Sequence, residues 1–351
     1  MTNELKRYLK NKKNLEDAFL YNPGHEHDSC GVGFVASTDG KQRREVVQGG
    51  IDALKAVWHR GAVDADGKTG DGAGILTQIP YNFFDDEIAK TGHEKRDEPL
   101  GIGMMFLPRN DYAALEKCRT IIESELLDHG YYIYGWRQVP INNSVIGEKA
   151  NSTRPEIEQV MFVNNIERDK DFDFAKELYL VRRRLEKRIA KQQINGFYVC
   201  SLSFESIIYK GLFLAEQLSI FYPDLANEEF ISSFAVFHQR YSTNTFPSWG
   251  LAQPFRLLAH NGEINTISGN TNWMRNHQTR ITTEIFGDDS EQVKPIIEKN
   301  VSDSSALDAA FELYVRAGRS VPLVKTLLIP EAWSKRSELM PIEHRNMYEF
   351  S

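Results

Sequence analysis

Cys30 is the residue of this sequence that is best placed to attack a substrate. It stands where a polar stretch, residues 25–29, gives way to a predicted strand, and glycines follow it at positions 31 and 33. A strand start holds a side chain firmly yet accessibly, and the glycines let a substrate or a second backbone come close. The other two cysteines are predicted core residues, because Cys118 lies on the apolar stripe of a predicted helix and Cys200 alternates with apolar residues of a predicted strand.

A thiol needs a base before it can act as a nucleophile, since an unperturbed pKa of about 8.5 leaves it mostly protonated at neutral pH. His27 lies two residues from Cys30, and a side chain so placed on an extended chain need not reach the sulfur. Cleavage between Ser29 and Cys30 would supply another base, a free α-amine with a pKa of about 7.7–8.0. In N-terminal nucleophiles one residue supplies both the attacking atom and the base. Cys30 taken alone does not decide between His27 and a free α-amine as the base.

The elements that would hold Cys30 include several consecutive strands. Apolar residues spaced by three and four, such as Val47, Ile51 and Leu54, predict a helix over 44–58. Further helices are predicted over 5–19, 115–126 (closed by Gly130), 173–192, about 265–280 and 303–316, and strands over 31–36, 75–79, 101–107, 131–139, 157–164, 196–203 and 231–239. Because several strands follow one another with no intervening helix, the pattern predicts an α+β fold with stacked sheets in one domain.

Composition and charge argue against several classes of protein. The formal net charge of −7 does not suit non-specific nucleic-acid binding, and the basic run Arg182–Arg184 is predicted to be the solvated face of a charged helix. No apolar run is long enough for a membrane span or a secretory signal. The cysteines lack the spacing of a zinc or iron–sulfur site, so we expect no metal in this chain. A reducing cytoplasm is the expected location.

Five segments, in order along the chain, resemble one known family. They are residues 27–34 (HDSCGVGF), 58–74 (WHRGAVDADGKTGDGAG), 238–249 (HQRYSTNTFPSW), 260–266 (HNGEINT) and 302–304 (SDS). Together they resemble the class II glutamine amidotransferase domain of the glutamate synthase large subunit. The resemblance implies an N-terminal-nucleophile hydrolase fold, a four-layer α/β/β/α sandwich. It also implies that residues 1–29 are a leader removed on maturation and that residues 30–351 form the amidotransferase domain.

The resemblance also implies a role for polar residues of these segments. The side-chain amide of Asn261 and the backbone N–H of Gly262, which follow a predicted strand over 255–259, would stabilise the oxyanion of a tetrahedral intermediate. The structural alternative is an ordinary Asn-Gly turn. Arg240 would bind the α-carboxylate of glutamine through paired hydrogen bonds. Asp303 would bind the α-ammonium, unless it only caps the helix that follows.

Three further expectations complete the site. Thr243 and His260 would contact glutamine, and Arg60 would support the nucleophile, with a surface ion pair as the alternative for Arg60. The glycine-rich segment 61–74 has neither the ligand spacing of a calcium loop nor the Gly-Lys-Ser/Thr of a phosphate loop. We expect it to be a flexible loop that closes over bound glutamine.

The implied reaction is hydrolysis of L-glutamine to glutamate and ammonia through a cysteinyl thioester. In the family, a synthase region with FMN and an iron–sulfur cluster uses the ammonia for reductive amination of 2-oxoglutarate, in some cases with a small reductase subunit. That region is absent from this chain, which we expect to be a fragment, a truncated product or one piece of a split enzyme. Two alternatives stay open: an unprocessed, inert assembly or ammonia-gating module, and an acyl-hydrolase that acts on another amide.

Overall fold

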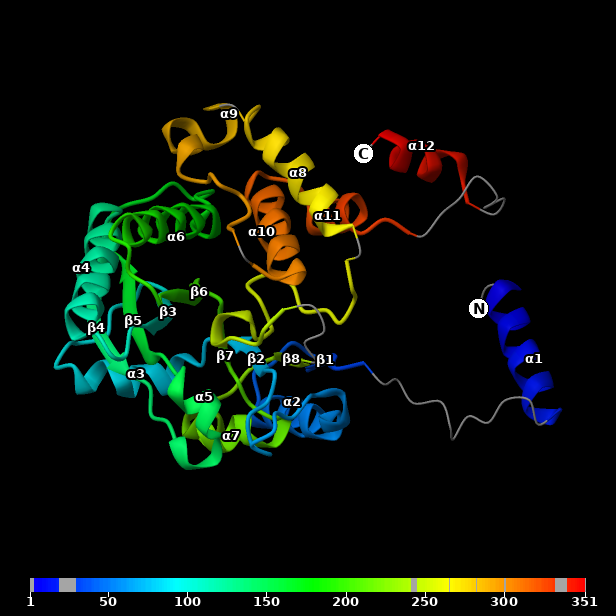
Figure 1. Cartoon of the computed structure of the whole chain (residues 1–351), viewed down its shortest axis with the longest axis horizontal. Coiled ribbons are helices and arrows are strands. Elements are labelled where there is room, and N and C mark those ends of the chain that lie inside the picture. The colour runs from blue at the N-terminus through cyan, green and yellow to red at the C-terminus, as the bar shows by residue number, and fades with distance from the viewer. Residues whose placement is uncertain are drawn as a thin grey trace. The chain divides into compact units, whose positions relative to one another are not determined.

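The computed structural model describes residues 3–18, 30–240, 245–264, 266–281, 283–299, 301–331 and 340–350 (Figure 1). Two units follow one another along the chain, residues 1–30 and residues 31–351. The first contains helix α1 (Asn3–Asp17), which confirms the helix predicted over 5–19. The second contains two sheets and the helices around them. Within the described ranges, no helix combines the length and the apolar character that crossing a bilayer requires.

The strands of the second unit form two four-stranded antiparallel sheets. The first, called here the site sheet, has the order β1 (Val32–Ala36), β8 (Phe234–Gln239), β2 (Ala73–Gln78) and β7 (Ser206–Gly211). The second sheet has the order β4 (Tyr131–Gln138), β5 (Glu156–Asn164), β3 (Leu100–Leu107) and β6 (Tyr198–Ser203). In the site sheet β8 pairs with β1 on one side and with β2 on the other, so the residues of β8 are held from both edges.

Helices pack on both sheets. Helix α2 (Arg44–Ala56) lies against β8 of the site sheet and buries Val47, Ile51 and Leu54, as its spacing predicts. Helices α4 (Tyr112–Asp128) and α6 (Phe174–Lys191) form an apolar cluster with β3 and β5 of the second sheet. The remaining helices of four or more residues are α3 (Tyr81–Lys90), α5 (Glu148–Ser152), α7 (Leu218–Phe221), α8 (Ile267–Gln278), α9 (Thr283–Phe286), α10 (Asp303–Arg316), α11 (Val321–Leu328) and α12 (Ile342–Phe350).

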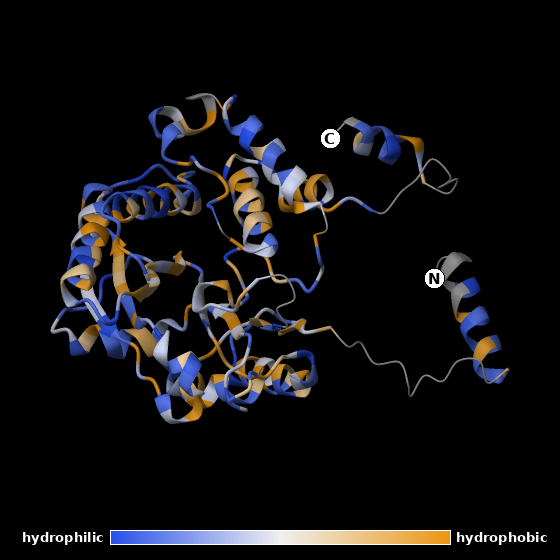
Figure 2. Cartoon of the chain, in the orientation of Figure 1, coloured by the Kyte–Doolittle hydropathy of each residue, from blue (hydrophilic) through white to orange (hydrophobic). Residues whose placement is uncertain are grey.

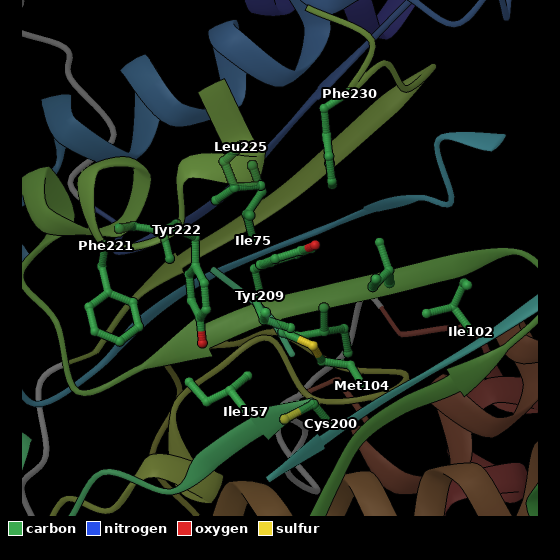
Figure 3. Close-up of a cluster of buried hydrophobic side chains, with 14 of the residues drawn as sticks. Ile75, Ile102, Met104, Ile157, Cys200, Tyr209, Phe221, Tyr222, Leu225 and Phe230 are labelled. Carbon is green, nitrogen blue, oxygen red and sulfur yellow. The ribbon is translucent and has the colours of Figure 1, made fainter. Parts of the chain in front are cut away.

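The largest apolar cluster draws side chains from both sheets. Figure 3 shows Ile75 and Tyr209 of the site sheet close to Met104 and Ile157 of the second sheet. The hydroxyl of Tyr209 accepts a hydrogen bond from Gln159 (2.9 Å) and donates one to a carboxylate, so this polar atom is satisfied inside the cluster. With helices on the sheets and a shared core, the four-layer sandwich is confirmed.

Two sequence predictions about structure were wrong. Residues 255–259 do not form a strand, because the backbone N–H groups of Leu257 and Leu258 bind a carboxylate of α10 in place of a neighbouring strand. The run in α6 is not a solvated face either. Figure 2 shows α6 as largely hydrophilic, yet Arg182 is only 4% exposed and pairs with carboxylates on two helices. Periodicity cannot reveal that a charged side chain has a partner from a distant element.

Candidate active site

Gly31 connects Cys30 to the site sheet. The thiol of Cys30 is free and exposed, and the next residue accepts a hydrogen bond at its carbonyl from the backbone N–H of Gln239 (2.6 Å). A β-carbon at position 31 would lie 2.4 Å from the carbonyl oxygen of Gln239 and 2.7 Å from Nδ2 of Asn261. Only glycine fits such a gap. The amide nitrogen of the predicted oxyanion residue therefore lies against the residue that follows the predicted nucleophile.

A clamp fixes the backbone that precedes Asn261. The side chain of Gln253 is buried, and its Oε1 accepts from the backbone N–H of His260 (3.0 Å) while its Nε2 donates to the carbonyl of the same residue (3.1 Å). Nε2 of His238, in β8, lies 3.1 Å from that carbonyl as well. Three side-chain hydrogen bonds thus hold His260, and through it the Asn261-Gly262 pair, in relation to the site sheet.

Helix α10 also holds the segment that precedes His260. Oδ1 of Asp308, which is 1% exposed, accepts from the backbone N–H groups of Leu257 (2.9 Å) and Leu258 (3.1 Å). The guanidinium of Arg256 lies near this carboxylate and donates to Glu312 of the same helix (3.3 Å). The buried charges are paired and hydrogen-bonded, as burial of charge requires.

Arg240 directly follows β8 and is buried, with its backbone N–H donated to the carbonyl of Gly72 (2.8 Å). Its Nη2 donates to Oγ1 of Thr245 (2.8 Å), whereas its Nη1 is buried without a hydrogen-bond partner among the described residues. Burial lowers the pKa of Arg240, and the carboxylates of Asp71 and Asp303 counteract that effect. A buried guanidinium with an unused donor suits an anionic group such as a carboxylate.

Asp303 is the first residue of α10 and not its cap. The cap is Ser302, whose side chain accepts from the backbone N–H of Ser305 (3.1 Å). Oδ1 of Asp303 accepts from the N–H of Ser304 (2.7 Å), and Oδ2 accepts from the N–H of Ile264 (3.3 Å) in the segment after Gly262. The cap is thus the neighbouring serine, whereas the carboxylate of Asp303 binds backbone N–H groups on both sides of the helix start, and its contact with glutamine stays a prediction.

Of the two residues predicted to contact glutamine, the structure describes His260. Burial lowers the pKa of His260, and Asp303 opposes the shift. Nε2 of His260 is buried without a hydrogen-bond partner among the described residues. Thr243 lies outside the described residues. The carboxylate of Asp303 thus opposes the lowering of the pKa of both Arg240 and His260.

Arg60 is exposed in the turn that precedes the glycine-rich segment. Its Cβ would be 3.4 Å from a β-carbon at position 31, so it lies beside the residue that follows Cys30. None of the ion pairs found among the described residues includes Arg60, which leaves the surface ion pair without support. Its supporting role stays a prediction.

The glycines of segment 61–74 serve close packing. A β-carbon at Gly70 would lie 2.1 Å from the carbonyl oxygen of Phe213, and one at Gly74 would lie 2.5 Å from that of Gln253. Gly72 adopts a φ of +138°, a conformation that other residues rarely take. Residues 73–78 are strand β2 of the site sheet. The expected loop therefore ends at Gly72, because the last two residues of the segment, Ala73 and Gly74, belong to β2.

The sequence reasoning missed His238 and Gln253. Both are buried polar residues, and neither was assigned a function although His238 lies inside one of the five resembling segments. The available signal was a histidine directly after the apolar run 234–237 of a predicted strand. Within the described residues there is also no group of three or more His, Cys, Asp or Glu side chains arranged to hold a metal ion.

Comparison with known families shows the family to which the chain belongs. The family model for class II glutamine amidotransferases matches residues 30–351, beginning at Cys30. The chain belongs to the class II glutamine amidotransferases. This amidotransferase is 58% identical over 336 residues to the glutamate synthase [NADPH] large chain of Azospirillum brasilense, which covers 96% of the chain and 22% of the relative.

Two other relatives also match most of this chain and about a fifth of their own length. The ferredoxin-dependent chloroplastic glutamate synthase of Spinacia oleracea is 41% identical over 329 residues, 93% of the chain and 20% of the relative. The glutamate synthase [NADPH] large chain of Bacillus subtilis is 41% identical over 331 residues, 94% of the chain and 22% of the relative. The amidotransferase thus spans about a fifth of the length of these curated relatives.

Proposed function

We propose that this amidotransferase hydrolyses L-glutamine to glutamate and ammonia with Cys30 as its nucleophile, after removal of residues 1–29. The observation that carries the proposal is the 2.7 Å approach between Nδ2 of Asn261 and the β-carbon position of Gly31, the residue bonded to Cys30. The start of the family match at residue 30 supports the maturation step. Both observations support a reaction in which an amide donor acts beside a thiol at the N-terminus of the processed chain.

The proposed reaction has two steps, formation of a glutamyl thioester and its hydrolysis. The α-amine of Cys30 takes the thiol proton, and the sulfur attacks the side-chain carbonyl carbon of glutamine. Asn261 and Gly262 donate hydrogen bonds to the resulting oxyanion. The C–N bond then breaks, the proton passes from the α-ammonium to the departing nitrogen, and ammonia leaves a glutamyl thioester. The α-amine then takes a proton from a water molecule, whose oxygen attacks the thioester carbonyl. The C–S bond breaks, the proton passes to the departing sulfur, and glutamate and the thiol are released.

Charge complementarity accounts for the choice of substrate. The unused Nη1 of the buried Arg240 would bind the α-carboxylate of glutamine. Asp303 would bind the α-ammonium, since its carboxylate lies near Arg240 and His260 and is not the helix cap. His260 and Thr243 would contact the rest of the molecule, and Arg60 would support the segment that follows Cys30. An amide substrate without either charged end would leave a buried group unpaired.

The larger protein implied by the relatives is a glutamate synthase. We propose that the ammonia is destined for reductive amination of 2-oxoglutarate by a synthase region beyond this chain. FMN and an iron–sulfur cluster would belong to that region, and a small reductase subunit would be a further partner. The relatives include both an NADPH and a ferredoxin-dependent enzyme, so the family leaves the electron donor open. We expect the protein in a reducing compartment such as the cytoplasm, where its three cysteines stay free.

The proposal is tested by intact-mass measurement, glutamate release and labelling on one preparation. We expect a mass that corresponds to loss of residues 1–29, glutamate release from L-glutamine, and a label from a thiol-alkylating glutamine analogue on Cys30. The matched controls are Cys30→Ser and Cys118→Ser, of which only the first should abolish labelling. Label on Cys118 or Cys200 would overturn the site. A retained leader with no glutamate release would favour the inert module.

A further inference from the structure

Lys210 is a fully buried lysine in β7, the strand of the site sheet that pairs with β2. None of the ion pairs found among the described residues includes it. Its Nζ donates instead to the carbonyl oxygens of Gly250 (2.9 Å) and Ala252 (2.8 Å) and to the hydroxyl of Tyr198 (3.3 Å). A lysine has three N–H donors, so each has an acceptor here, and two of them bind the main chain of one segment.

Two aromatic rings also lie next to Nζ of Lys210. The nitrogen is 4.6 Å from the ring centroid of Tyr198 and 5.0 Å from that of Phe255, which is buried. A cation is attracted to an aromatic face, and more strongly where water is excluded. Phe255 lies two residues after Gln253, whereas Gly250 and Ala252 come before it. The contacts of Lys210 therefore hold the chain on both sides of Gln253.

Gln253 connects this segment to the residue before Asn261. A β-carbon at Gly74, which stands opposite Lys210 in β2, would lie 2.5 Å from the carbonyl oxygen of Gln253 and 2.7 Å from Cβ of Lys210. The main chain of Gln253 therefore packs against the site sheet beside Lys210. Its side chain makes both hydrogen bonds to the backbone of His260, at 3.0 Å to the N–H and 3.1 Å to the carbonyl.

We infer that Lys210 is a positioning residue for the predicted oxyanion donor Asn261 and acts on it through Gln253. Nζ fixes the chain around Gln253, the amide of Gln253 holds the backbone of His260, and His260 is bonded to Asn261. An oxyanion donor is effective only if it is in place before the charge develops. Loss of Lys210 should therefore displace the donor and leave the thiol of Cys30 reactive. The inference rests on the proposed glutaminase function.

The first experiment compares catalysis with the reactivity of the thiol in Lys210→Met, which keeps an unbranched side chain and removes all three donors. We expect kcat for glutamine to fall about 100-fold with KM nearly unchanged, as for a displaced transition-state donor. Alkylation of Cys30 by iodoacetamide forms no oxyanion, so its rate should stay within about 3-fold of the wild type. Gln159→Met is the matched control and should keep kcat, because Gln159 is a buried polar residue whose hydrogen bonds lie in the core between the sheets.

A double-mutant cycle tests the connection through Gln253. Gln253→Met should also lower kcat, and adding Lys210→Met should cause no further loss, because the connection is already broken. Additive losses, an unchanged kcat in Lys210→Met, or an equal fall in iodoacetamide reactivity would each overturn the inference.

A second substitution covers poor folding of Lys210→Met. The amide of Lys210→Gln is one bond shorter and cannot reach both carbonyls, so kcat should fall about 10-fold, and a kcat equal to that of the wild type would refute the positioning role. Absence of glutamate release by the wild type would instead reject the proposed function itself.

Discussion

Adding one methyl group at position 31 should disable the amidotransferase. In Gly31→Ala the new β-carbon would lie 2.4 Å from the carbonyl oxygen of Gln239. Relief to an ordinary contact of roughly 3.5 Å requires about 1 Å of movement. Gln239 belongs to β8, which is paired on both sides, so the start of β1 moves and carries the bonded Cys30 with it. A displacement of that size at a nucleophile costs about 100-fold in kcat.

Glutamate release and thermal unfolding, measured together on Gly31→Ala, test this reasoning. The expected loss of stability is about 1–3 kcal/mol, the usual cost of overpacking. Intact mass shows whether maturation also fails. Gly49→Ala is the matched control, because its β-carbon would meet only Cγ1 of Val35 at 3.4 Å and alanine favours the helix. If Gly31→Ala keeps kcat within 3-fold of the control, the close packing beside Cys30 is not what positions the nucleophile.

Four other expectations follow from the site and its supports. Burial raises the thiol pKa to about 11 for Cys118 and about 12 for Cys200, so iodoacetamide at pH 8 should leave both unlabelled in the native protein. Arg240→Gln should raise KM for glutamine about 100-fold, which initial-rate kinetics would show. Asp308→Ala should lower the free energy of unfolding by about 3–5 kcal/mol in urea titrations, and Asp308→Asn by less, because the amide still accepts. The folded-state pKa of His238, about 4, lies below its unfolded value of about 6.5, so the unfolded chain binds more protons between these values. Stability is therefore lost as pH falls from 7 to 5, by about 2 kcal/mol more in the wild type than in His238→Gln; equal pH dependence would contradict this.

The local sequence pattern predicted those features that depend only on neighbouring residues of the chain. The apolar spacing of α2 and the burial of Cys118 and Cys200 are confirmed, since a helix stripe or an alternating strand identifies its own buried face. The pattern also predicted Asn261 and Arg240 as site residues through the resembling segments, and the structure describes both beside other predicted site residues. Those assignments of function stay predictions until they are measured.

Other features depend on contacts between distant segments, and no local pattern contains them. The strand β7 was not predicted, and residues 255–259 were predicted as a strand because their apolar character resembles one. Their N–H groups bind Asp308, which lies about fifty positions further along the chain. The same holds for Arg182, whose burial depends on Glu312 of α10. In each case a long-range polar partner reverses what the local sequence indicates.

Strand β8 explains why the predicted site residues can work together. Its last two residues and the residue after them take three tasks in succession: His238 bonds to the carbonyl before Asn261, Gln239 bonds to Gly31 beside Cys30, and Arg240 has a donor, Nη1, without a partner among the described residues. Successive residues of a strand point to opposite faces, so a shift of one position would exchange these tasks. Pairing with β1 and β2 on its two sides prevents such a shift. The residues predicted as nucleophile, oxyanion donor and carboxylate anchor are therefore tied to the register of one strand, so we expect that register to matter for catalysis as well as for folding.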